Sequence, residues 1–547
     1  MNIDTKMLKE RAIMSKISSA KDELKTPDEF ELEAGNDYNL RRIAGVYREY
    51  QKTLKLNNAL DFDDLIFKTV ELFQSDAEVL EHYQDRFRYI MVDEYQDTNT
   101  SQFKLVAMLA AKYGNICVVG DDDQSIYKFR GANIYNILNF ENVFTGAKVI
   151  KLEQNYRSTQ TILNAANAVI SNNIGRKSKS LWTDNGEGEK VNYTLYENGY
   201  DEAEGVASGI AEYVRDGWNY NDVAILYRTN AQSRALEEKL MIHNIPYKIY
   251  GGQNFYQRKE IKDILAYLKT IDNGLDGQAV KRIINVPKRG IGNTTIDRLQ
   301  EYADFNDITF WEALVNAKDI DTIKNAALSK LEPFVDLIGR LRAKEEFMSL
   351  KELAEAVIED TGYIESLSQN ETVEEVEARR ENLDEFINKV VSYEEGCKEA
   401  GEEPTLSGLL EEVALIADID NLDESEPHVM LMTLHSAKGL EFPIVYMTGM
   451  EDGLFPSYMT IVSDDSTEIE EERRLCYVGI TRAEKILNLT SAKSRMVRGE
   501  TQMNKVSRFI NEIPKSNFAV VIVPLKYGVV FTILFLYKPA TIVAWSV

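Results

Sequence analysis

The chain has 547 residues, of which 44% are hydrophobic and 28% are charged, and its formal net charge is -26. One hydrophobic core rarely organises so long a chain, so several domains are expected, and the composition favours a globular protein over a disordered one. The acidic balance alone argues against a nucleic-acid partner, because phosphate is neutralised by Lys and Arg. A local basic groove can nevertheless exist on an acidic chain.

The three cysteines, Cys117, Cys397 and Cys476, lie far apart and form no CxxC motif. This spacing predicts neither a disulfide framework nor a zinc site, and it favours a reducing, cytoplasmic setting. The first residues lack the apolar core that a signal peptide needs.

Residues 1–65 read as helical, with a polar, turn-prone stretch around Thr26 to Asp37. Beyond them, short apolar runs end in polar residues, which is the pattern of buried parallel strands alternating with helices. The runs are Tyr89–Val92, Ile116–Val119 and Val149–Leu152. Polar groups that follow parallel strands are expected to converge on one crevice.

The first run ends in two adjacent carboxylates, Asp93 and Glu94. In nucleotide hydrolysis one carboxylate can hold Mg²⁺ on the phosphates while its neighbour orients and deprotonates the attacking water. The alternative is an ordinary acidic pair at a strand end. The next run leads into GDDDQSIYKFRGA, in which Gln124 suits a terminal phosphate or its water, and Tyr127 and Phe129 offer flat faces on which bases stack.

A second series of apolar runs predicts further parallel strands at Val223–Tyr227, Val429–Met432, Ile444–Met447 and Ile486–Leu489. About 160 residues of helical periodicity, including Ala326–Arg342 and Leu353–Ile358, separate the first two and indicate an inserted helical domain. Within it, Gly290 and Gly292 form a tight turn feeding a capped helix, whose free N–H groups suit a phosphate. An ordinary helix-turn-helix connection is the alternative.

From Phe518 to Val547 the chain turns apolar, interrupted by Lys526 and Lys538. Because the change is abrupt, we interpret residues 515–547 as an apolar tail of non-native origin, such as a shifted reading frame. A membrane anchor is the alternative, but about 20 mostly apolar residues are reached only by including Lys538 and Pro539. No membrane partner is expected unless this tail is genuine.

Five motifs in order, DEYQDT, GDDDQSIYKFRGA, QNYRS, TLHSAKGLEF and VGITRA, resemble those of UvrD/PcrA/Rep-type superfamily 1 DNA helicases, and the similarity runs from about Lys21 to Pro514. The resemblance implies an α/β fold of two RecA-like parallel-sheet lobes, the first incomplete, with a large helical insertion in the second. The expected domains are a helical remnant of the first-lobe insertion (1–65), a partial first lobe (66–157), the second lobe (158–262 and 426–514), the helical insertion (263–425) and the apolar tail (515–547).

The resemblance also assigns roles, with ATP and Mg²⁺ as cofactors. Arg157 and Arg482 become arginine fingers at the γ-phosphate, and Glu441 a contact of the nucleotide sugar; taken alone, each reads as a surface residue. The expected site residues are Asp93, Glu94, Gln124, Arg157 and Arg482 for catalysis, with Asp93 and Glu94 holding the metal; Gln124, Arg157, Glu441 and Arg482 for the nucleotide; and Tyr127, Phe129, Arg130, His435, Gly290 and Gly292 for DNA.

The implied function is that of an ATP-dependent 3′-5′ DNA helicase or translocase in repair and replication. Its expected partners are single-stranded DNA, single/double-strand junctions, and repair or transcription proteins. Two alternatives remain open at this point. One is an inactive fragment that binds DNA or a partner without ATP turnover. The other is a helicase-nuclease relative, which would need a nuclease domain after Arg482.

The family begins with a phosphate-binding loop, GxxxxGK[ST], yet the 547 residues contain no Gly-Lys dipeptide. Met1 aligns inside the first-lobe insertion, which implies an N-terminally truncated chain. We therefore predict that this polypeptide does not hydrolyse ATP at a useful rate, since losing even one electrostatic donor costs about 100- to 1000-fold. DNA-stimulated ATPase is measured on this polypeptide and on the same polypeptide joined to a family-type upstream segment. Comparable turnover by the two would contradict the prediction.

Overall fold

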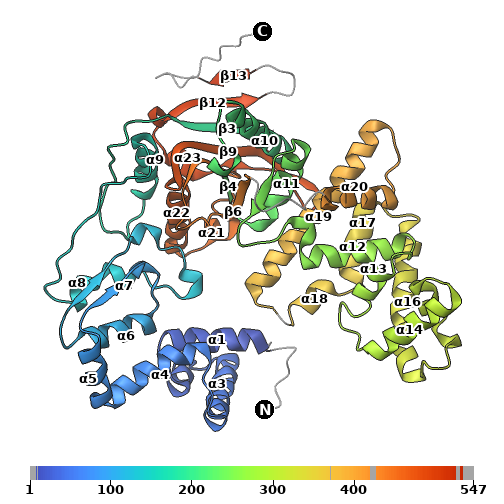
Figure 1. The fold of residues 1–547 in the computed structure, drawn as a ribbon, viewed down its shortest axis with the longest axis horizontal. Coiled ribbons are helices and arrows are strands. Elements are labelled where there is room, and N and C mark those ends of the chain that lie inside the picture. The colour runs from blue at the N-terminus through green and yellow to red at the C-terminus, as the bar shows by residue number, and fades with distance from the viewer. Residues whose placement is uncertain (1–7, 9, 370, 419–426, 525–529, 534–547) are drawn as a thin grey trace.

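The computed structural model describes residues 8, 10–369, 371–418, 427–524 and 530–533 (Figure 1). A large sheet occupies one end of the molecule, helices of the N-terminal part lie at the other end, and a separate group of helices stands to one side. Residues 525–529 and 534–547 of the expected apolar tail lie outside the described part. None of the helices among the described residues has the length and apolarity to cross a membrane.

The large sheet has nine strands, in the order β13-β12-β3-β9-β7-β4-β6-β5, with β10 paired to β9. Every pair from β12 to β5 is parallel, whereas β13 and β10 pair antiparallel. The strands are β3 (Val191–Asn198), β4 (Val223–Tyr227), β5 (Tyr247–Ile249), β6 (Val429–Thr433), β7 (Phe442–Met447), β9 (Ala483–Val497), β10 (Glu500–Met503), β12 (Phe518–Pro524) and β13 (Val530–Ile533). All four strands predicted for this part are confirmed. The start of the expected tail, Phe518–Pro524, adds a strand beside β3.

Helices cover both faces of this sheet, as a buried parallel sheet requires. One face packs against α9 (Gln160–Ile170), α22 (Ser466–Ile480) and α23 (Arg508–Glu512), and the other against α10 (Gly199–Arg215) and α11 (Ser233–Ile242). The interior strand β4, which lies between β7 and β6, is buried at every residue. The chain therefore has the predicted α/β class, with a doubly covered parallel sheet.

A second, small sheet consists of β1 (Ile90–Val92) and β2 (Ile116–Val118), which pair in parallel. With α6 (Thr100–Ala110), α7 (Tyr135–Leu138) and α8 (Phe140–Val143) it forms what we call the small-sheet region, residues 90–143. The third strand predicted there, Val149–Leu152, is wrong: the segment has no ladder partner among the described residues, and Leu152 is exposed. The backbone pairs only just after it, through an isolated bridge between Gln154 and Trp182.

The N-terminal helices are α1 (Glu10–Asp22), α2 (Pro27–Glu33), α3 (Tyr38–Leu56), α4 (Phe62–Ser75) and α5 (Ala77–Arg86). The stretch read as turn-prone, Thr26 to Asp37, is mostly helix. Thr26 and Glu29 form a reciprocal capping box, and Pro27 occupies the first helical position. These residues start a helix because they satisfy its free N–H groups.

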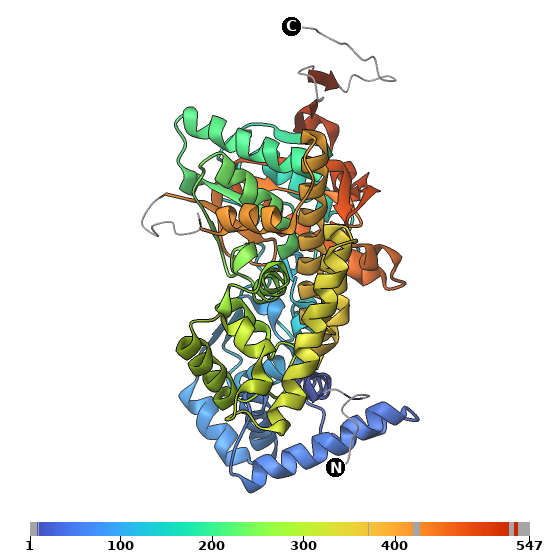
Figure 2. The same ribbon diagram turned by 90° about the vertical axis from the view of Figure 1, so that its right-hand side faces the viewer.

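Between β5 and β6 the described residues form helices and turns. The α-helices are α12 (Lys259–Asp272), α13 (Gly277–Ile283), α14 (Asn293–Asn306), α15 (Phe310–Val315), α16 (Asn325–Glu345), α17 (Leu350–Asp360), α18 (Tyr363–Leu367), α19 (Val373–Ala400) and α20 (Leu406–Asp418). They share a hydrophobic core of their own. Figure 2, turned by 90°, shows their yellow and orange ribbons on the side facing the viewer.

A buried ion cluster anchors the long strand β9. Arg495 pairs with Glu202 of α10 and, at 2.6 Å, with Glu451 of β8 (Glu451–Asp452), and both carboxylates are buried. β8 in turn pairs with β11 (Lys505–Val506), and the remaining short helix, α21 (Tyr458–Val462), precedes α22. Just past β9, Arg498 makes an exposed ion pair with Asp384 of α19. The two arginines therefore differ in their own burial, in the number of their partners and in the burial of those partners.

We predict that Arg495→Met lowers the free energy of unfolding by about 3 to 5 kcal/mol, because it leaves two buried carboxylates unpaired. The matched Arg498→Met, which removes an exposed pair, should cost about 1 kcal/mol or less. Urea denaturation followed by circular dichroism compares the two variants. Equal midpoints would contradict the assigned role of the buried cluster.

Candidate nucleotide and DNA site

Asp93 and Glu94 follow β1 and are both exposed. Asp93 Oδ1 accepts a hydrogen bond from the Glu94 N–H at 2.9 Å, and Glu94 has a left-handed backbone, φ 49°. This turn ends the strand and points two carboxylates out of the sheet. Gln96 Nε2 donates to Glu94 Oε2 at 2.6 Å, which fixes one of them.

Gln124 ends a short 3-10 helix, Asp122–Gln124, that follows β2. Its amide nitrogen donates to Asp121 Oδ2 at 2.8 Å, so its amide oxygen faces the other way. That oxygen lies 3.4 Å from Nη2 of Arg482, which comes from the large-sheet region, meaning the nine-stranded sheet with its connecting loops and the helices that cover it. Two residues separated by 358 positions therefore meet side chain to side chain.

Arg482 lies between α22 and β9 and is almost fully buried. Its Nε donates to the Val478 carbonyl at 3.0 Å, and Nη1 to the Leu440 carbonyl at 3.1 Å. Burial, and secondarily the charge of Arg157, lowers the pKa of Arg482 to about 10. The guanidinium stays charged at neutral pH and is aimed by backbone carbonyls.

Arg157 approaches the same place from the loop before α9. Its Nε donates to Glu441 Oε2 at 2.5 Å, and its Nη1 to the Thr481 carbonyl at 3.3 Å. The residues expected to bind nucleotide, Gln124, Arg157, Glu441 and Arg482, are thus linked around one seam between the small sheet and the large sheet. In this arrangement Arg157 and Glu441 neutralise each other.

Two further residues, Lys438 and Asp97, stand at this seam and were not singled out from the sequence. Lys438 Nζ lies 2.5 Å from Asp97 Oδ2, 2.9 Å from the Gln124 carbonyl and 3.4 Å from Glu94 Oε2. Both residues lie inside motifs already recognised, TLHSAKGLEF and DEYQDT. The motifs could have drawn attention to both residues. The contact between them could not be predicted from the sequence.

The expected DNA-facing side chains near this seam form one cluster. The rings of Tyr127 and Phe129 have centroids 6.1 Å apart, Phe129 meets the His435 ring edge to face at 5.4 Å, and the Arg130 guanidinium lies 5.3 Å and 5.4 Å from the two aromatic rings. Phe129 is 63% exposed. Burial, followed by the charges of Arg228 and Arg130, lowers the pKa of His435 to about 3, so its imidazole is neutral at physiological pH.

Gly290 and Gly292 are not brought to this cluster. Gly290 has φ 72° and Gly292 is the N-cap residue of α14, as the turn pattern predicts. α14 belongs to the group of helices beside the large sheet, at the end remote from it (Figure 1). Lys330 Nζ donates to the Gly290 carbonyl at 2.8 Å, which places one cation beside this turn.

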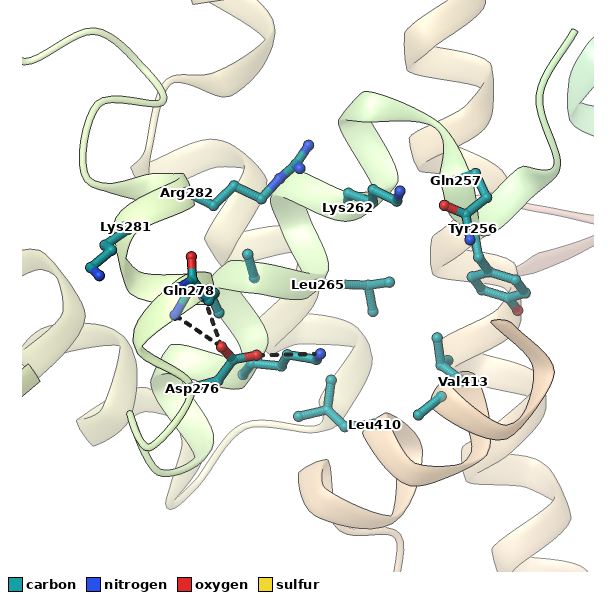
Figure 3. Close-up of a pocket in the computed structure, with 14 residues that line it drawn as sticks. Tyr256, Gln257, Lys262, Leu265, Asp276, Gln278, Lys281, Arg282, Leu410 and Val413 are labelled. Atoms are coloured by element: carbon teal, nitrogen blue, oxygen red, sulfur yellow. Dashed lines mark hydrogen bonds and ion pairs between the residues drawn. The ribbon is translucent and has the colours of Figure 1, made fainter. Parts of the chain in front are cut away.

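A groove of about 570 Å³ lies elsewhere, among α12, α13 and α20 (Figure 3). Leu265, Leu410 and Val413 form its apolar floor, and Lys262 and Arg282 flank it. It is separate from the carboxylates and arginines at the seam. The candidate nucleotide and DNA residues therefore lie outside this groove.

No group of three or more His, Cys, Asp or Glu suited to a metal ion occurs in the described ranges. Asp93 and Glu94 nonetheless fit a Mg²⁺ ion that is shared with phosphates, since exposed carboxylates are its preferred protein ligands.

Comparisons with known proteins identify the family of this chain and its relatives. The profile of the UvrD/REP helicase N-terminal domain matches residues 1–145, and that of the UvrD-like helicase C-terminal domain matches residues 150–494. The chain belongs to the UvrD-like helicase family. Among its UvrD-like relatives, the ATP-dependent DNA helicase PcrA of Staphylococcus aureus is 51% identical over 515 residues, covering 94% of this chain and 70% of the relative. PcrA of Staphylococcus epidermidis is 50% identical over 514 residues, with the same shares covered.

For this UvrD-like protein we predict that His435 makes stability fall with acidification. Its folded pKa of about 3 lies below the unfolded value of about 6.5, so the unfolded chain binds the proton first and stability is lost as pH falls from about 6.5 toward 3. At pH 5 this amounts to about 2 kcal/mol. In urea denaturation at pH 7 and pH 5, His435→Gln should lose that part of the pH dependence. The exposed His82→Gln serves as control, and an unchanged pH dependence in His435→Gln would refute the assignment.

Proposed function

We propose that this chain supplies catalytic and DNA-binding residues of an ATP-dependent DNA helicase that moves 3′ to 5′ along single-stranded DNA and unwinds duplexes in repair and replication. The observation that carries the proposal is the seam itself. Gln124 of the small-sheet region contacts Arg482 of the large-sheet region, and the Glu94 and Asp97 carboxylates contact Lys438. On the same segment as Gln124, the ring of Tyr127 is half-buried and that of Phe129 is exposed. The family membership and the name of the PcrA relatives, ATP-dependent DNA helicase, support the same activity.

Each residue has a proposed task. Asp93 and Glu94 would hold Mg²⁺, which supplies charge neutralisation on the phosphates, and Glu94 would accept the proton of the attacking water. Gln124 orients that water through its amide oxygen. Arg157 and Arg482 stabilise charge on the transferred phosphoryl, for which a planar guanidinium with several donors is suited.

Glu441 has two partners in this scheme. In the structure it accepts from Arg157, and in the working enzyme it would accept from a sugar hydroxyl of the nucleotide. Releasing Glu441 from Arg157 frees that guanidinium for the phosphate. Because the participating groups come from both sheets, hydrolysis is tied to the relative position of the two sheets, which converts turnover into stepping.

DNA is proposed to lie across Tyr127, Phe129, Arg130 and His435. Stacking on aromatic faces does not depend on base identity, which suits a motor that passes every base. The neutral His435 supports Phe129 without adding charge. Single-stranded DNA and single/double-strand junctions are accordingly the proposed partners, and Gly290 with Gly292 would contact the backbone of the duplex part through the N-terminus of α14.

The activity test uses this polypeptide joined to the loop-bearing upstream segment of a PcrA relative, with ATP turnover and strand separation followed on duplexes carrying a 3′ or a 5′ single-stranded tail. The 3′-tailed duplex should be opened. Arg482→Ala should lower DNA-stimulated turnover by about 1000-fold or more, since an arginine finger contributes that much. Arg498→Ala, outside the site, is the control. Opening of the 5′-tailed duplex alone, or full turnover by Arg482→Ala, would refute the proposal.

We predict that Phe129→Ala weakens binding of the polypeptide to oligo(dT) by about 1 to 3 kcal/mol, the value of one lost stack. The matched control is Tyr135→Ala on α7, where Tyr135 is 61% exposed but lies outside the aromatic cluster. Fluorescence anisotropy of a labelled oligonucleotide gives both affinities. Equal affinities of the two variants would remove Phe129 from the DNA site.

A further inference from the structure

Lys438 is a cation with an unusual set of neighbours. It lies in the loop between β6 and β7, and its side chain is only 7% exposed. Its ammonium has three N–H groups, and three oxygen acceptors surround it. They are a carboxylate oxygen of Asp97, the backbone carbonyl of Gln124 and a carboxylate oxygen of Glu94. All three belong to the small-sheet region, whereas Lys438 belongs to the large one.

Asp97 depends on this lysine. Its Oδ1 is buried without a hydrogen-bond partner among the described residues, and its Oδ2 receives the 2.5 Å contact from Lys438. Burial raises the pKa of Asp97, and the lysine opposes that shift. A carboxylate that is largely removed from water is costly unless it is paired, so Asp97 fixes the position of the ammonium.

The same ammonium also contacts Tyr127, one of the two rings proposed to stack on DNA bases. Nζ lies 5.1 Å from the centroid of the Tyr127 ring, within cation–π range. The Tyr127 hydroxyl donates to the His435 carbonyl at 3.3 Å, three residues before Lys438. Tyr127 is thus held at its ring and at its hydroxyl by one short loop of the large-sheet region.

We propose that Lys438 is a positioning residue that sets the orientation of Tyr127 for base stacking and ties that orientation to the Glu94 and Asp97 carboxylates. The inference rests on the proposed function. The same ammonium contacts both the Tyr127 ring and the two carboxylates. A base that displaces the Tyr127 ring therefore also shifts the positive charge that lies beside Glu94. Binding of DNA at the Tyr127 ring thereby changes the electrostatic environment of the two carboxylates without any movement of the large sheet.

The first test is a double-mutant cycle in oligo(dT) affinity, with Lys438→Met, Tyr127→Ala and their combination in the 547-residue polypeptide. Lys438→Met should weaken binding about tenfold, and the combination should be no more than about twofold weaker than Tyr127→Ala alone, because the two residues act as one unit. The salt dependence should not change, since Lys438 touches no phosphate. Unchanged affinity, multiplied losses, or a salt slope reduced by about 0.7 would overturn the proposal.

Two controls separate positioning from folding. Lys485→Met removes a lysine that lies 5.1 Å from the Trp218 ring outside the site, and it should leave affinity unchanged. Lys438→Arg keeps the charge and should retain most of the affinity. Equal losses in Lys438→Arg and Lys438→Met, with thermal midpoints lowered alike, would mean a structural role only and would overturn the proposal.

The second readout is the ratio of ATP turnover with and without oligo(dT) in the loop-bearing protein. Lys438→Met should lower this ratio at least tenfold, and an unchanged ratio would overturn the link to the carboxylates. A loop-bearing protein with an intact Lys438 but no turnover would refute the proposed function instead. The affinity cycle would still decide whether Lys438 positions Tyr127.

Discussion

The structure depends on two buried cations that cross from the large sheet to the small one. Lys438 and Arg482 both have little contact with water, and a buried cation is stable only when acceptors surround it. Part of each set of acceptors comes from the small-sheet region, through Asp97 and Gln124. Polar groups therefore help to hold the two sheets in register, together with Ile126 of the small-sheet region, which is buried in one of the hydrophobic cores of the large sheet.

The contacts of Lys438 and Arg482 with the small-sheet region explain why a proposed nucleotide-binding residue and the aromatic rings lie so close together. Gln124 and both aromatic rings are carried by one segment of 13 residues, GDDDQSIYKFRGA, folded into two 3-10 turns that end at Gln124 and Arg130. Short turns leave little freedom between neighbouring side chains. A shift that moves Gln124 against Arg482 also moves Tyr127 against Lys438, so the proposed chemistry and DNA binding share one mechanical element.

The sequence predicted elements whose signal is local. β4 is apolar throughout because it is buried on both faces, and Gly290 marks its turn by a positive φ. Val149–Leu152 looked the same as β4 but is not a strand, since composition does not reveal whether a partner lies alongside. The positions of Arg157, Gln124 and Arg482 followed from motifs, whereas the Lys438–Asp97 and Arg157–Glu441 pairs join residues hundreds of positions apart. Only the fold shows those pairs.

The central claim is that groups from the two sheets act as one site. A double-mutant cycle between Gln124 and Arg482 tests it most directly, using DNA-stimulated ATP turnover in the loop-bearing protein. If the 3.4 Å contact belongs to one catalytic unit, Gln124→Ala combined with Arg482→Ala should be about as slow as the slower single variant. Losses that multiply would show that the two residues act independently and would contradict the account.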